Sequence, residues 1–130
     1  MNGTVSALLA AFGRLLISSL FLYAGVGKLL APAATKLDIA VAGLPFPDLA
    51  YLVAVIIEVG FASALLVGYR TRTVAAVLAM FTVATAFAFH FNLSDQDQLV
   101  HFLKNLAITG GLLQIVAAGG GAYSLDARSR

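Results

Sequence analysis

Four apolar segments alternate with short polar stretches along the chain. A helix rises about 1.5 Å per residue, so roughly 20 residues cross a hydrocarbon core of about 30 Å. Each apolar segment is long enough, or nearly long enough, to cross this core. We therefore predict an all-α polytopic membrane protein, a four-helix transmembrane bundle in one domain of residues 1–130. The predicted spans are residues 8–30, 49–68, 73–91 and 99–118.

The polar stretches between these segments predict the connections. Residues 31–48 contain Pro32, Gly43, Pro45 and Pro47, and proline is poorly tolerated inside a helix. This stretch is interpreted as an interfacial loop with at most one short amphipathic turn. Three consecutive glycines end the last span, and a polar tail follows them.

A polar stripe runs along the first apolar segment. In a helix, Arg14, Ser18, Phe21, Gly25 and Lys28 share one face, because their spacings are four, three, four and three residues. A charge facing lipid is costly. The stripe should therefore face protein or water, and we expect the other three helices to cover it.

Composition supports a membrane protein. Hydrophobic residues make up 61% of the chain and charged residues 11%, whereas roughly 25% is typical of soluble domains. No basic patch with interleaved aromatic residues indicates nucleic-acid binding. Cysteine is absent, which excludes disulfides and thiol chemistry within the chain. Two histidines on different helices, with no acid near them, do not predict a metal site.

Most of the charges outside the spans separate by sign. With four spans, four arginines fall on one side of the membrane and four aspartates on the other. The positive-inside rule then places both termini in the cytoplasm. The arginines are Arg70, Arg72, Arg128 and Arg130, and the aspartates are Asp38, Asp48, Asp95 and Asp97.

Glu58 is the only acid within the predicted spans. It lies about 15 Å from the cytoplasmic end of its helix, and Arg14 lies about 9 Å from the same side. An arginine side chain can bridge most of this difference, so we predict an Arg14–Glu58 ion pair. The pair either has a functional role or fixes the register of the bundle.

A second polar group is expected near the outer ends of the helices. Lys28, His90, Lys104 and Asn105 come from three helices and lie at similar predicted depth. They are candidates for a shared substrate-binding pocket. The alternative is that Lys28 extends to the headgroups and that His90 and His101 make interfacial hydrogen bonds.

Several segments together resemble the DoxX family of small bacterial membrane proteins. The order of these segments carries the resemblance, which covers nearly the whole chain. It implies a multi-pass protein of the bacterial inner membrane, associated with quinone-linked oxidoreductases. The segments are Arg14-Leu15-Leu16 with Phe21, Gly25 and Lys28, then EVGFASALLVGYRTR (58–72), FAFHF (87–91), FLKNLAITGGLL (102–113) and GAYSLDA (121–127).

Three functional hypotheses follow. The first is a membrane subunit of a redox system that binds a quinone or another lipid-phase small molecule, or couples a partner oxidoreductase to the quinone pool. Such a chain would not be a complete enzyme, because no intrinsic cofactor site is evident. The second is a non-enzymatic assembly or chaperone-like module, and the third is a small transporter or proton relay. The expected partners are the bilayer and either a redox protein or a second copy of the chain.

Overall fold

The computed structural model describes residues 2–129, and every regular element in this range is helical. One of these elements is a π-helical turn, labelled η1, in the middle of the second span. The elements are α1 (Gly3–Leu30), α2 (Pro32–Val41), α3 (Pro47–Val55), η1 (Ile56–Phe61), α4 (Ala62–Val67), α5 (Thr71–Phe89), α6 (Gln96–Ala118) and α7 (Leu125–Arg128).

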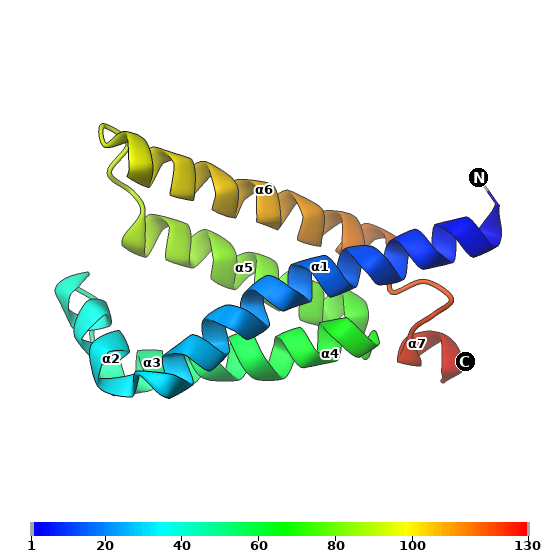
Figure 1. The fold of residues 1–130 in the computed structure, drawn as a ribbon, viewed down its shortest axis with the longest axis horizontal. Helices are drawn as coiled ribbons and strands as arrows, with labels where there is room; N and C mark the ends of the chain where they lie inside the picture. Colours follow the sequence, from blue (N-terminus) through cyan, green and yellow to red (C-terminus); the bar gives the residue numbers. More distant parts are fainter. Residues whose placement is uncertain (1, 130) are drawn as a thin grey trace.

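Four helical segments are long and apolar enough to cross a membrane, which confirms the predicted all-α fold with four spans. They are α1, the continuous run α3–η1–α4, α5 and α6 (Figure 1). The first begins five residues earlier than predicted because Asn2 caps it. The Asn2 side chain accepts hydrogen bonds from the backbone N–H groups of Thr4 and Val5.

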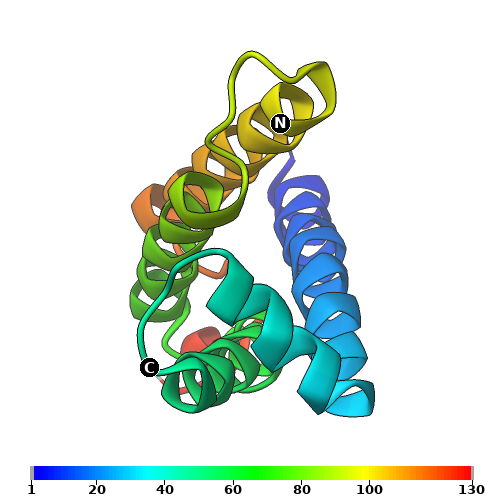
Figure 2. The same cartoon turned by 90° about the vertical axis from the view of Figure 1, so that its left-hand side faces the viewer.

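The spans are packed as two units. Helices α5 and α6 form a tight antiparallel pair, and α1 packs along α4 and η1. The core lies where the units meet and includes Phe21, Leu65, Leu78 and Leu112. Figure 2 shows α1 separated from α6 toward the end that carries α2 and α3.

The first connection differs from the prediction. Residues 32–41 form the ten-residue helix α2 rather than a loop, and Ile39 on α2 is buried. Pro32 and Pro47 each stand in the first turn of a helix, where the missing N–H costs nothing. Pro32 and Pro47 therefore begin helices, and the turn between α2 and α3 contains Pro45 and Gly43, the latter with φ +86°.

Both ends of the described chain lie at the same end of the bundle (Figure 1). This arrangement agrees with an even number of spans. The assignment of that end to the cytoplasm stays a prediction. Of the arginines on which that assignment rests, Arg130 lies outside the described residues.

Gly25 allows α1 and η1 to approach closely. A Cβ at this position would lie 2.7 Å from Cγ2 of Val59 and 2.9 Å from Cβ of Glu58. Gly27, two residues later on the same helix, has no heavy atom within 4 Å of the equivalent position. Close packing at glycine is a common way for membrane helices to associate.

We therefore expect Gly25→Ala to lower the free energy of unfolding by about 1–3 kcal/mol, since the added methyl overpacks the contact. Gly27→Ala is the matched control and should change stability by less than about 0.5 kcal/mol. The measurement is reversible unfolding of the purified protein in detergent. Equal stability of the two variants would show that α1 does not approach η1 at Gly25.

Candidate functional site

The polar stripe of α1 faces protein, as the sequence predicts. Arg14 is 2% exposed and Ser18 is fully buried. Phe21 and Gly25 are also buried. Lys28, at the far end of the stripe, is partly exposed. The two cations lie 14 residues apart and therefore about 21 Å along the helix, so each has its own surroundings.

Lys28 forms an ion pair with Glu58. Its Nζ lies 2.9 Å from Oε1 and donates a hydrogen bond of 2.9 Å to Oε2 of the same carboxylate. The Lys28 side chain is 28% exposed, and the Glu58 side chain is 5% exposed. The acid is therefore enclosed by protein, whereas the base is open on one side.

Glu58 lies in the π-helical turn η1. The turn is closed by a hydrogen bond from the N–H of Ala62 to the carbonyl of Ile57, five residues earlier. A π turn widens the helix locally, and single π turns inside α-helices are frequent at functional sites. The sequence carried no signal for this turn, and we expected a continuous α-helix here.

Three further contacts hold the C-terminal end of α1. The Tyr51 hydroxyl on α3 donates a 3.0 Å hydrogen bond to the backbone carbonyl of Lys28. Lys36 on α2 lies over the Tyr51 ring, 5.1 Å from its centroid, and pairs with Asp48 at 3.2 Å. These contacts tie α1, α2 and α3 together beside the Lys28–Glu58 pair.

Arg14 binds backbone carbonyls at the opposite end of the bundle. Its Nη1 donates to the carbonyls of Leu65 (3.2 Å) and Leu66 (2.7 Å), and its Nη2 donates to the carbonyl of Tyr123. Leu65 and Leu66 lie in the last turn of α4, where carbonyls lack the usual donor four residues on. The Leu65 carbonyl also accepts a 3.1 Å hydrogen bond from the N–H of Gly68. A cation is favourable there because of the helix dipole.

The predicted Arg14–Glu58 pair is therefore wrong. Glu58 pairs with Lys28, and Arg14 caps α4 and holds the C-terminal tail. Depth along the helix axes suggested the pair, but depth alone omits which faces of the helices meet. The contact of Gly25 with Glu58 sets that register and brings Lys28 to the acid, three residues beyond Gly25.

The tail following α6 is fixed by Asp126. Its carboxylate accepts hydrogen bonds from the N–H groups of Arg70 (2.7 Å) and Thr71 (2.8 Å) and from the Thr71 hydroxyl (2.6 Å). Asp126 thus caps α5 from a distant part of the chain. This role was not predicted from the sequence, although an acid after the glycines in a polar tail is a usable signal.

Glycines allow the tail to pack closely against the α4–α5 turn. A Cβ at Gly68 would lie 2.3 Å from Cβ of Ser124, and a Cβ at Gly120 would lie 2.6 Å from Oγ1 of Thr71. Gly68 also has φ +76°, a conformation that other residues rarely adopt. Arg14, these glycines and Asp126 together lock the tail to the bundle.

The four residues predicted to share an outer pocket do not gather in one place. Lys28 is held by Glu58. On the α5–α6 pair, Nδ1 of His90 lies 2.9 Å from Oε1 of Gln98, and the His90 ring stacks on His101 at 5.2 Å. The Asn105 side chain donates to the backbone carbonyl of Thr82 and to the hydroxyl of Thr85, both on α5. Lys104 is exposed on α6.

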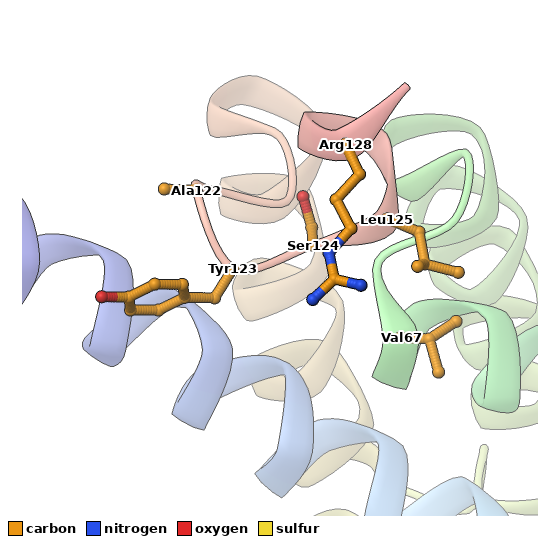
Figure 3. A pocket seen from close by; sticks show the side chains of 6 residues that line it. All are labelled: Val67, Ala122, Tyr123, Ser124, Leu125 and Arg128. Atoms are coloured by element: carbon orange, nitrogen blue, oxygen red, sulfur yellow. The ribbon is translucent and has the colours of Figure 1, made fainter. Parts of the chain in front are cut away.

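Two hollows lie at the tail end of the bundle. One, of about 260 Å³, is lined by Val67, residues 122–125 and Arg128. Figure 3 shows the Arg128 side chain extending over it. A second, of about 240 Å³, lies beside the start of α5. Within residues 2–129, no group of three or more histidines and acids is arranged to hold a metal ion.

Four apolar spans around buried charges define an integral membrane protein, and the comparisons with known proteins give its family. A model of the DoxX family matches residues 9–91, and the chain belongs to this family. It is 39% identical over 113 residues to "Inner membrane protein YqjF" of Escherichia coli (strain K12), covering 87% of this chain and 85% of that protein.

A second relative, "Inner membrane protein YphA" of the same organism, is 30% identical over 131 residues. That match covers 97% of this chain and 94% of the relative. No solved structure matches the chain. With four membrane-spanning helices and these relatives, the protein is a multi-pass protein of the inner membrane.

The contacts of Arg14 with α4 and with the tail predict the behaviour of Arg14→Met. The variant removes the Arg14 donor from the carbonyls of Leu66 and Tyr123, whereas the Leu65 carbonyl keeps the N–H of Gly68. This loss should lower the free energy of unfolding by about 1.5–3 kcal/mol. The backbone at Tyr123 should also become accessible, so chymotrypsin should cleave there faster than in the wild type. Ser19→Ala, at an exposed position on the same helix, is the control. Unchanged cleavage in Arg14→Met would show that Arg14 does not hold the tail to the bundle.

Proposed function

We propose that this chain is the membrane subunit of a redox system and that Lys28 and Glu58 receive the head group of a quinone or a similar lipid-phase molecule. One observation carries the proposal. An ion pair lies within the apolar bundle, its acid enclosed and its base open on one side. Ionisable groups in this setting are costly and are often functional.

The pair has the chemistry that a quinone head group requires. A quinone carbonyl accepts hydrogen bonds, and reduction of a quinone to a quinol takes up two electrons and two protons. A lysine ammonium has three donors, and one of them donates to Oε2 of Glu58. Another donor can serve a ligand carbonyl on the open side of Lys28, and the carboxylate beside it can exchange a proton.

The surroundings of Glu58 support this role. The π turn places the carboxylate on a locally widened helix. Gly25 keeps α1 close to it, and Tyr51 fixes the backbone at Lys28. A group held from several sides keeps its position when a ligand arrives, which favours binding.

The proposal leaves the supply of electrons to a partner redox protein. The chain has no cysteine, so it cannot provide thiolate ligands for an iron–sulfur cluster. A quinone is the one cofactor proposed. The ligand-binding roles predicted for His90, Lys104 and Asn105 stay predictions, and their positions on the α5–α6 pair separate them from Lys28.

A second function, a non-enzymatic assembly module, is favoured by the exposure of α6. Only 11% of its apolar span is buried within the described chain. This helix therefore offers a large surface to another membrane protein or to a second copy of the chain. In this alternative the Lys28–Glu58 pair only fixes the packing of α1 on η1.

Quinone retention separates the two functions. Purified protein in detergent is equilibrated with decylubiquinone, and the bound quinone is quantified by absorbance after gel filtration. We expect Lys28→Met and Glu58→Gln to weaken retention roughly tenfold or more, the effect of losing a hydrogen bond to a charged group. Lys36→Met, which removes a neighbouring, partly exposed cation, is the matched control and should retain the quinone.

Melting temperatures are measured in parallel to identify variants that lose the fold. Equal retention by the folded Lys28→Met variant and the wild type would rule out the proposed site. Absence of retention by the wild type would rule out quinone binding. A stoichiometric membrane partner in such a quinone-free preparation would then favour the assembly module.

A further inference from the structure

The smaller hollow at the tail end lies between the start of α5 and the end of α6. Two arginines and two threonines stand at its α5 side, and two glycines form its α6 side. Its volume is about 240 Å³. Its lining residues are Arg70, Thr71, Arg72, Thr73, Gly119, Gly120 and Asp126.

Arg70 is anchored at one edge of the hollow. Its Nε donates to the Tyr69 hydroxyl at 3.2 Å, and its guanidinium lies 5.8 Å from the centroid of the same ring. Its backbone has φ +46°, which is unfavourable for a residue with a side chain. Such strain persists where the surrounding contacts enforce it, and it is frequent at binding sites.

Arg72 packs against Gly119, and both residues line the hollow. A Cβ on Gly119 would lie 3.2 Å from Nε and 3.4 Å from Nη2 of Arg72. The guanidinium therefore lies against bare backbone at the end of α6, where the helix dipole favours a cation. Both arginines line the same hollow. Arg70 packs on Tyr69, and Arg72 packs on Gly119.

The acid in the lining does not cancel this charge. Both carboxylate oxygens of Asp126 accept hydrogen bonds from the backbone of Arg70 and Thr71 and from the Thr71 hydroxyl. The lining residues carry two guanidinium groups and one carboxylate, so the net charge of the lining is positive. The hydroxyl of Thr73 adds a further donor at its edge.

We propose that this hollow binds the phosphate of an anionic phospholipid headgroup. A guanidinium donates two parallel hydrogen bonds to phosphate oxygens, and basic pockets between membrane helices suit anionic lipids. The hollow lies at the ends of two spans and beside Tyr69, an aromatic residue typical of the headgroup level. The inference goes beyond the proposed redox function and does not depend on it.

Native mass spectrometry of the detergent-solubilised protein tests the proposal. Phosphatidylglycerol and phosphatidylcholine with identical acyl chains are added in competition. The wild type should prefer phosphatidylglycerol. In Arg70→Gln/Arg72→Gln the affinity for this lipid should fall roughly thirtyfold, the loss expected for two basic residues near the membrane surface. Arg128→Gln removes one cation at the same end but from the other hollow, and should keep the preference.

Two further arms keep the result interpretable. Arg70→Gly relieves the backbone strain while removing one guanidinium, so it should melt no lower than the wild type and still lose lipid affinity. Inorganic phosphate is added alone to detect binding of the free ion. Stabilisation of the wild type by phosphate, with no preference for phosphatidylglycerol, would overturn the headgroup assignment. Full lipid preference in the double variant, or an equal loss in Arg128→Gln, would overturn the site.

Discussion

A charge inside an apolar bundle must find a counter-charge or a set of carbonyls within the protein, and the rest of this structure depends on that constraint. On insertion scales, one unpaired charge near the middle of a membrane helix costs about 2.5–3.5 kcal/mol. The chain carries three ionisable groups in the packed faces of its first two spans. Lys28 and Glu58 neutralise each other, and Arg14 binds carbonyls of α4 and of the tail.

Because the charges are satisfied in these two ways, the two ends of the bundle differ in how closely they are packed. At the tail end, Arg14 and Asp126 join α1, α4, α5 and the tail into one closed unit. At the other end, α1 separates from α6 (Figure 2), and Lys28 stays partly exposed. Quinone binding is proposed at the end where Lys28 remains accessible, and the closed end anchors the tail and carries the proposed headgroup site.

The sequence predicted the number of spans and the buried face of α1. It also showed that Glu58 is the only acid within the predicted spans. Hydropathy and helical spacing determine these features, so they can be inferred without tertiary contacts. The partner of Glu58 could not be inferred, because it depends on the approach of Gly25 to η1. Helix α2 was missed because the prolines were interpreted as breaks, although Pro32 and Pro47 lie at helix starts.

The partner of Glu58 is tested most directly by exchanging charges. Lys28→Glu and Glu58→Lys each place like charges together, and each should lower the melting temperature sharply in detergent. The double variant restores an opposite pair at the same position and should recover most of the loss. The corresponding exchange between Arg14 and Glu58 should recover nothing, because Arg14 binds carbonyls at the other end of α1. Recovery in the Arg14 exchange, without recovery in the Lys28 exchange, would contradict this account.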